Sequence, residues 1–219
     1  MAKGTEMTKM AFLEGCSFRR MLWLWLRHGT KPPERPSVLR FTLAAPPAMV
    51  DKEAFREAMS TFPGAVAVVT ALDDEGQPRG LTCSAVCSLS MDPPLLLTCV
   101  NQRNGSLRAI RHSGGFVVNL LKANCGALSD RFASASADKF QGVAWVPSPA
   151  SGLPWLYRDV LAHVDCHLIA DIGAGSHAIL VGSVRLGERS QCQEGPLVYW
   201  WRNYGSWSAA VPEQEAAHD

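Results

Sequence analysis

The stretch RGLTCSAVCSLSMDPPLLLTCV, residues 79–100, contains the pattern that decides the fold. In its first part small hydroxylated residues alternate with apolar ones, which is typical of a strand with two different faces. Pro93 and Pro94 end this alternation. The residues that follow, 95–100, form a continuous apolar run with the length of a buried strand. The stretch therefore predicts successive strands with no helix between them.

A valine- and threonine-rich run, residues 65–71, precedes this stretch and is separated from it by Asp73-Asp74-Glu75-Gly76. Acidic residues followed by glycine are typical of a turn, so this run and residues 80–84 predict a hairpin. Further β runs follow along the chain, with a glycine-rich turn at residues 173–175. These runs are residues 115–121, 160–170, 178–185 and 196–200.

At least six short strands with few, short helices favour a mainly β fold, a closed or half-closed antiparallel barrel. A parallel α/β sheet would need crossover helices at regular intervals, and the sequence shows no such alternation. The motifs Gly-x-Gly-x-x-Gly and Gly-x-x-x-x-Gly-Lys are also missing from the sequence. A nucleotide would therefore not be held in a Rossmann or P-loop cradle.

Three short helices are expected. The first begins after Met49, because Asp51 is a good N-cap and acidic residues follow in the early turns. Its residues Phe55, Met59 and Phe62 lie three to four apart and predict a buried stripe. The other two helices are predicted at residues 106–112, capped by Ser106, and at residues 125–132.

Residues 1–48 differ from the rest and predict a loosely ordered extension, followed by a domain over 49–210 and a tail over 211–219. The apolar run at 21–26 has six residues, far short of the roughly 20 needed to span a bilayer. Residues 31–47 contain five prolines, which predicts a linker that neither continues a helix nor forms a packed strand.

Composition excludes several functions. The net charge is +1 and only 19% of the residues are charged, so we expect neither nucleic-acid binding nor a polybasic membrane anchor. Seven cysteines without a Cys-x-x-Cys pair form neither a disulfide framework nor a metal site. Free thiols that act as small apolar side chains in a reducing cytoplasm are the favoured interpretation.

A set of short motifs follows in order along the chain. They are Phe62-Pro63-Gly64, Gly80-Leu81-Thr82-x-Ser84-Ala85, Ser88-Leu89-Ser90-x-x-Pro93-Pro94, FVVNLL at 116–121, Gly175-Ser176-His177, Val181-Gly182-x-Val184 and Pro196-Leu197-Val198-Tyr199. In this order and spacing, the span from about Phe55 to Trp207 resembles the flavin-reductase-like, FMN-binding split-barrel family. That family comprises the reductase components of two-component flavin monooxygenases.

The resemblance implies an antiparallel split β-barrel that binds FMN or FAD and uses NADH or NADPH. It implies that the hydroxyl-rich strand lines the flavin ring and ribityl chain, and that the end of the next strand contacts the phosphate. A helix N-terminus nearby suits a phosphate on physical grounds as well. The candidate flavin-binding residues are Thr82, Ser84, Ala85, Ser88, Ser90, Cys99, Val100, Asn101, Ser106, Arg131 and Phe132.

His177 is the candidate catalytic residue, because the resemblance places it near the nicotinamide. It follows a glycine-rich turn and precedes a strand, so we expect an accessible ring at the barrel rim. Purely structural roles stay open as alternatives. A lone histidine is more often structural than catalytic, and the residues of the hydroxyl-rich strand could belong to an ordinary edge strand. The aromatic segment 200–207 could close the core, contact a second subunit or stack on a ligand, with packing favoured.

The function that the resemblance implies is NAD(P)H-dependent reduction of free or loosely bound flavin, which is then supplied to a partner monooxygenase. The cofactors carry the chemistry, and the protein orients them and excludes water. A homodimer with the flavin near its interface is implied as well. Three alternatives remain: an FMN-binding electron carrier, a flavin oxidase similar to pyridoxamine-phosphate oxidase, and a non-enzymatic β-barrel interaction module.

Overall fold

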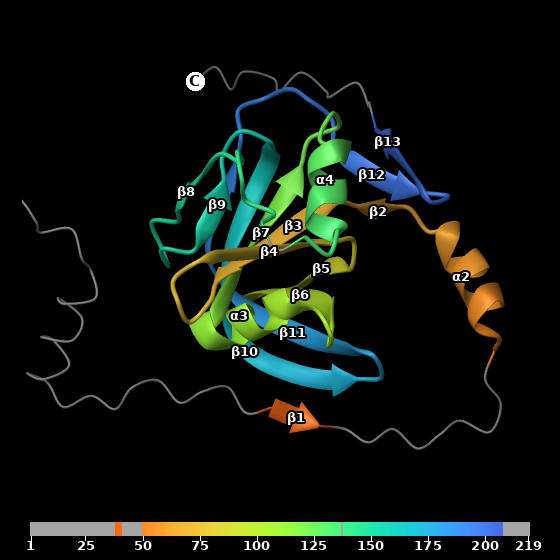
Figure 1. Cartoon of the computed structure of the whole chain (residues 1–219), viewed down its shortest axis with the longest axis horizontal. Coiled ribbons are helices and arrows are strands. Elements are labelled where there is room, and N and C mark those ends of the chain that lie inside the picture. Colours follow the sequence, from red (N-terminus) through yellow and green to blue (C-terminus); the bar gives the residue numbers. More distant parts are fainter. Residues whose placement is uncertain (1–37, 41–49, 137, 208–219) are drawn as a thin grey trace, which may run out of the picture. The chain divides into compact units, whose positions relative to one another are not determined.

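The computed structural model describes residues 38–40, 50–136 and 138–207, which all fall within one unit of the chain, residues 36–219 (Figure 1). Strands predominate, as the sequence predicts. The helices are α2 Lys52–Ser60, α3 Gly105–Ser113 and α4 Gly126–Ala133. The strands are β1 Val38–Arg40, β2 Gly64–Ala65, β3 Ala67–Leu72, β4 Pro78–Cys83, β5 Val86–Met91, β6 Pro94–Asn101, β7 Gly115–Leu121, β8 Trp145–Pro147, β9 Pro154–Leu156, β10 Val160–Ala174, β11 His177–Arg189, β12 Leu197–Trp200 and β13 Asn203–Ser206.

The main sheet has the strand order β4-β3-β7-β10-β11-β6-β5, and each of these neighbouring pairs is antiparallel. The short strand β1 pairs with β10 in parallel, off this path. Two smaller sheets, β13-β12-β2 and β8-β9, complete the described strands. This arrangement confirms the predicted antiparallel, mainly β fold.

The two ends of the main sheet meet where β4 passes into β5. The thiol of Cys83, the last residue of β4, lies 3.3 Å from the Thr98 hydroxyl and donates to the Cys99 carbonyl oxygen of β6 at 3.4 Å. Only two residues, Ser84 and Ala85, separate β4 from β5. The sheet therefore curls back on itself, and this short connection lies at the opening of the split barrel.

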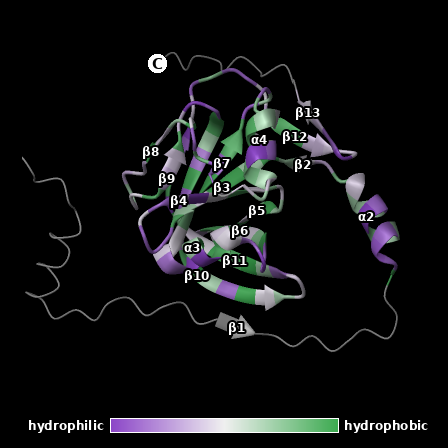
Figure 2. Ribbon diagram, in the orientation of Figure 1, coloured by the Kyte–Doolittle hydropathy of each residue, from purple (hydrophilic) through white to green (hydrophobic). Residues whose placement is uncertain are grey.

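Apolar side chains from both halves of the sheet fill the barrel, and α3 adds buried residues from one side. In Figure 2 the central strands β3 and β7 are mostly green, which marks hydrophobic residues. Gly182 shows how tightly this core is packed, since an added Cβ would lie 2.6 Å from Cys166 Cβ and 2.8 Å from the Phe116 ring. The fully buried members include Val69, Val100, Leu107, Ile110, Phe116, Val118 and Leu180.

A second core lies under α4 and the β8–β9 ribbon. Its buried members are Val66, Val68, Leu121, Cys125, Phe132, Leu156, Val160 and Leu197. The ribbon is also attached through buried polar groups. Asn119 Oδ1 accepts from the Leu156 backbone at 2.9 Å, the Thr70 hydroxyl donates to the Pro154 carbonyl oxygen, and both serines Ser148 and Ser151 donate to Asp165.

Two helix predictions need correction. Asp51 caps α2 as predicted, accepting from Glu53 N at 3.1 Å and Ala54 N at 3.3 Å. The predicted burial of its apolar stripe is wrong: Phe55 and Phe62 are 57% and 69% exposed, and no residue of α2 is buried. In α3 the N-cap is Asn104 rather than Ser106, since the asparagine side chain accepts from the Ser106 backbone.

The prediction that residues 31–47 contain no packed strand is wrong for Val38–Arg40. These three residues pair with Asp171–Gly173 of β10. Strand β7 covers β10 only from Val160 to His167, so the backbone groups further along that edge of β10 are free to accept another strand. The remainder of the predicted extension and the tail at 211–219 lie outside the described residues.

Candidate functional site

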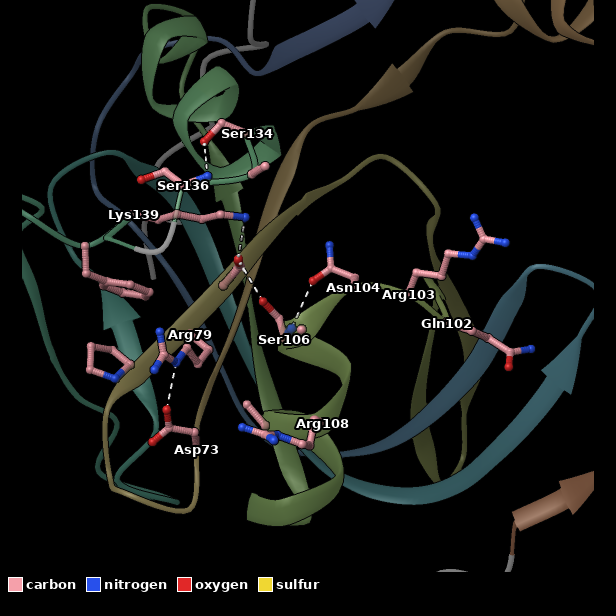
Figure 3. A pocket seen from close by; sticks show the side chains of 16 residues that line it. Asp73, Arg79, Gln102, Arg103, Asn104, Ser106, Arg108, Ser134, Ser136 and Lys139 are labelled. Carbon is pink, nitrogen blue, oxygen red and sulfur yellow. Dashed lines mark hydrogen bonds and ion pairs between the residues drawn. The ribbon is translucent and has the colours of Figure 1, made fainter.

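A cavity of about 700 Å³ opens between β4, the start of α3 and the segment that follows α4 (Figure 3). Cavities that bind cofactors and other small ligands have volumes of about 300–1,000 Å³. The lining residues are Asp73, Pro78, Arg79, Gly80, Gln102, Arg103, Asn104, Gly105, Ser106, Arg108, Ala109, Ser134, Ala135, Ser136, Lys139 and Phe140.

The N-terminus of α3 forms one wall of this cavity. Asn104 Oδ1 accepts from the Ser106 backbone at 3.0 Å, and the Ser106 hydroxyl donates to the Gly80 carbonyl oxygen of β4 at 2.9 Å. The first bond caps the helix, and the second fixes its first turn against the strand, as Figure 3 shows. The first turn of a helix carries N–H groups without intrahelical partners and partial positive charge, so this wall favours an anion.

Lys139 forms the opposite wall. Its ammonium group donates to the Phe132 carbonyl oxygen at 2.8 Å and to the Gly80 carbonyl oxygen at 3.4 Å. Burial lowers the pKa of Lys139. Within the described part of the chain no carboxylate lies close enough to pair with it. A half-buried ammonium group without a counter-charge strongly favours a bound anion.

Three arginines add further positive charge to the lining. Arg79 donates through Nε to the Asp73 carboxylate at 2.7 Å, whereas Arg103 and Arg108 are exposed. Burial raises the pKa of Asp73, but backbone donation from Gln77 and the contact with Arg79 outweigh it and hold the pKa below its ordinary value. One ionised carboxylate thus faces four cationic side chains, and the cavity carries net positive charge.

The strand surface beside the cavity carries most of the sequence-predicted flavin residues. Ser84, Ala85 and Ser88 are exposed, and Ser90 is half-buried. Thr82, also half-buried, donates its hydroxyl to the Ser129 carbonyl oxygen of α4. Thr82 lies two residues after Gly80 on β4, Ser84 and Ala85 form the connection that follows, and Ser88 and Ser90 belong to β5. The candidate flavin residues therefore follow the cavity directly along the chain.

The ends of β6 and β11 bring the remaining polar candidates together. His177 and Asn101 are paired in the β6–β11 register, and the Ala85 carbonyl oxygen accepts from the Cys99 backbone at 3.1 Å. His177 is exposed, and its Nδ1 lies 2.9 Å from the Ser176 hydroxyl. Burial raises the pKa of the Cys99 thiol. The predicted position of His177 at the barrel rim, with an accessible ring, is confirmed.

Three candidates lie differently from the others. The side chains of Val100 and Phe132 are fully buried in the two cores, so these side chains cannot contact a ligand in this structure. Phe132 serves the cavity through its backbone, which accepts from Lys139. Arg131 is exposed and donates to the Gln141 carbonyl oxygen at 2.7 Å.

The charged residues of the cavity itself were not predicted from the sequence. Lys139, Arg103 and Arg108 belong to segments without a motif, and Lys139 is 59 residues away from Gly80. Gln102 was also missed; its side chain donates to the Gly175 and His177 carbonyl oxygens at 3.0 and 3.2 Å and so joins the cavity to the His177 turn. The available signal was Asn104, a residue type that favours helix N-caps.

Among the described residues, no group of three or more histidine, cysteine, aspartate or glutamate side chains could hold a metal ion. No helix in this part of the chain is long and apolar enough to cross a membrane.

Comparison with known proteins identifies the family. The protein-family model described as flavin reductase like domain matches residues 59–208, more than half of the chain. The flavin reductase (NADH) of Kitasatospora aureofaciens is 41% identical over 186 residues, which cover 85% of this chain and 96% of the relative. The flavin reductase (NADPH) of Lentzea aerocolonigenes is 39% identical over 163 residues, covering 74% and 94%.

A solved structure supports the same assignment. Nitrilotriacetate monooxygenase component B from Mycobacterium thermoresistibile superposes with a TM-score of 0.68 at 31% identity, covering 77% of this chain and 91% of that one. Sequence and fold thus agree over the region that contains the cavity and His177. The chain therefore belongs to the flavin reductase-like domain family.

Proposed function

We propose that this protein is an NAD(P)H:flavin oxidoreductase that reduces FMN or FAD and supplies the reduced flavin to a partner monooxygenase. The observation that carries the proposal is the contiguity of three parts: a cationic cavity, an exposed hydroxyl-bearing strand and an exposed histidine. A flavin has one anionic phosphate end and one flat, uncharged ring, and these parts match both. The names of the two flavin reductase relatives support the nicotinamide and flavin cofactors.

The phosphate end of the flavin belongs at the start of α3. Ser106, the first-turn N–H groups and the Lys139 ammonium group converge there, next to the Gly80 backbone. The ring belongs on the strand surface beside it, where Thr82, Ser84, Ala85, Ser88 and Ser90 offer hydroxyl and backbone groups. Cys99 and Asn101 extend this surface toward the rim.

The proposed mechanism does not require a side chain of the protein to donate or accept a proton. When bound, the flavin supplies the hydride acceptor, and the nicotinamide supplies the hydride. His177 positions the nicotinamide at the rim, and its orientation is fixed by Ser176 on one side and by Gln102 on the backbone. The hydroxyl-bearing surface and the rim would orient the bound flavin and nicotinamide and exclude water.

A homodimer is part of this proposal. The apolar stripe of α2 is exposed, and so are Leu89 and Met91 on the edge strand β5, at 49% and 85%. The flavin surface at Ser84 and Ala85 lies beside this edge strand. Large exposed apolar patches typically mark an interface. A second copy that covers Leu89 and Met91 would also lie close to Ser84 and Ala85, where we place the flavin ring.

The monooxygenase partner and the cytoplasm are the cellular part of the proposal. The similar structure is named as component B of a nitrilotriacetate monooxygenase, which supports a monooxygenase as the protein that receives the reduced flavin. The described cysteines are all free thiols, in keeping with a reducing compartment. Residues 49–210 would form the catalytic domain of the chain.

The test is a turnover assay with the full chain. NADH or NADPH loss is followed in air by absorbance, with and without added FMN or FAD. Steady oxidation that requires added flavin supports the reductase. Bound flavin with no turnover of either nicotinamide would contradict it and favour an electron carrier or an oxidase. The variant His177→Ala should raise the KM for the nicotinamide; unchanged kinetics would exclude His177 from the site.

A further inference from the structure

The cavity is much larger than the flavin phosphate requires. Among the flavin residues implied by the family resemblance, only Ser106 lines it, because the ring-binding candidates lie outside on the strand surface. Its volume of about 700 Å³ falls within the range of about 300–1,000 Å³ that holds an entire small ligand. A phosphate at the start of α3 would occupy one end and leave the other end unoccupied.

Apart from Arg103, whose side chain points away from the other cationic groups in Figure 3, the positive charge of the cavity forms two groups. One group is Lys139 with the first turn of α3. The other group is Arg79 and Arg108, which approach from β4 and α3 near Asp73 (Figure 3). FMN has a single phosphate and would use only the first group. A diphosphate would extend from the first group toward the second.

We propose that this cavity binds the second phosphate and the adenosine of FAD, so that FAD rather than FMN is the preferred flavin. The inference rests on the proposed function, because it assumes that a flavin phosphate lies at the start of α3. It adds a role for Arg108, which the family resemblance does not assign.

Arg108 is suited to this role because it is accessible and weakly paired. Its side chain is 83% exposed, and its nearest carboxylate, Asp74, is 3.9 Å away. A screened pair at that distance contributes little, so the guanidinium group can turn to a phosphate at small cost. Its planar fork can donate two parallel hydrogen bonds to a phosphate or stack on an adenine ring.

Asp73 does not oppose the binding of a dinucleotide. Oδ1 accepts from the backbones of Glu75 and Gln77, at 3.0 and 2.8 Å, and Oδ2 accepts from Arg79. The carboxylate thus holds the β3–β4 turn and orients Arg79. Apolar surface for an adenine ring is available nearby, from Pro78, Ala135 and Phe140.

The test measures the dissociation constants of FMN and FAD by flavin fluorescence, with the full chain and four variants. We expect the wild-type protein to bind FAD about tenfold more tightly than FMN. Arg108→Gln should weaken FAD binding by about five- to twentyfold and change FMN binding by less than about twofold. Arg108→Glu should enlarge the loss for FAD. Lys139→Gln should weaken both flavins, because both share the first phosphate. Arg185→Gln, which removes an exposed arginine of β11, is the matched control and should change neither constant.

Three results would overturn the inference. Equal binding of FMN and FAD, or equal loss of both in Arg108→Gln, would show that the cavity does not read the second phosphate. A rise in the KM for NADPH in Arg108→Gln with unchanged FAD binding would assign the cavity to the nicotinamide cofactor instead. Binding of neither flavin would overturn the proposed function itself, whereas flavin-dependent turnover with equal flavin affinities would overturn this inference alone.

Discussion

The two faces of the β6–β11 strand pair have similar chemistry and very different surroundings. On the inner face Val100 and Leu180 are fully buried. On the outer face Leu97, Ile179 and Val181 are only half-buried. The outer side chains are as apolar as the inner ones, so hydrophobicity alone does not decide which face the chain covers by itself.

The difference teaches what a continuous apolar run means in an antiparallel sheet. Such strands usually have one polar face, because only one face is packed on the core. A strand that is apolar on both faces needs a second packing partner on the face that the core does not contact. Here the inner face has the barrel core and α3, and we propose that a second copy covers the outer face. The exposed stripe of α2 is a separate surface, which we propose belongs to the same dimer.

The largest expected effect comes from truncating the inner face. Leu180→Ala should lower the free energy of unfolding by about 2–5 kcal/mol, because it leaves a cavity in a closely packed core. Ile179→Ala, the next residue on the outer face, should cost less than about 1 kcal/mol. Urea unfolding at low protein concentration measures both. Equal costs would show that the outer face is as well packed as the inner one.

Substitution of the α2 stripe should weaken the proposed dimer. Phe55→Asp combined with Phe62→Asp places two charges where we propose the subunit interface, and should raise the dimer dissociation constant by at least about 30-fold. Sedimentation equilibrium measures this constant. Arg56→Ala, on the same helix, is the control and should leave the dimer intact. A double variant that dimerises like the wild type would remove α2 from the interface.

Much of the fold could be predicted because its signals are local. Strand β7 begins and ends where the sequence places it, at Gly115 and Leu121, since its residues are nearly all apolar and follow Gly114, which has a φ of 64°. The start of α2 was predicted from the Asp51 cap. The burial of its stripe was not, because periodicity shows that a helix face is apolar but does not show what covers it.

The candidate site divides in the same way. His177 could be placed at a rim because a glycine-rich turn precedes it and a strand follows. The role of Lys139 could not be predicted, since it depends on carbonyl oxygens of two other segments, at Gly80 and Phe132. Ser106 was predicted to cap α3, whereas Asn104 is the cap and Ser106 lies in the first turn. Asparagine and serine are both good capping residues, so the sequence alone does not distinguish between them.

Alkaline pH should weaken flavin binding through Lys139. Burial lowers the pKa of this ammonium group in the free protein, and a bound phosphate would raise it again. The protonated form therefore binds the flavin more tightly, and affinity should fall as the pH rises through the pKa of the free protein. Flavin titrations between pH 7 and about pH 10 measure this loss, and the range ends near the ordinary lysine pKa. Lys139→Arg should remove the dependence and retain binding, whereas a dependence that persists in this variant would assign the titration to another group.

The smallest expected effect is on the pH dependence of stability, through a histidine that is buried beneath the β8–β9 ribbon. His163 is only 3% exposed, and its ring stacks on Trp155 with a centroid distance of 3.5 Å. Burial lowers the pKa of His163, although the carboxylates of Glu188 and Asp165 oppose this shift. In the unfolded chain the same histidine takes up a proton below about pH 6.5.

Between these two pKa values the unfolded state binds more protons than the folded state, so the free energy of unfolding falls as the pH is lowered through about 6.5. Thermal unfolding of the full chain between pH 8 and 5 should show this loss, and His163→Gln should reduce its slope. His112→Gln, an exposed histidine on α3, controls for the removal of a histidine. If His163→Gln keeps the wild-type slope, the acid sensitivity comes from elsewhere. A reduced slope would show that His163 resists protonation because the β8–β9 ribbon covers it, unlike the exposed surface at Ser84 and Ala85, where we propose that the flavin binds.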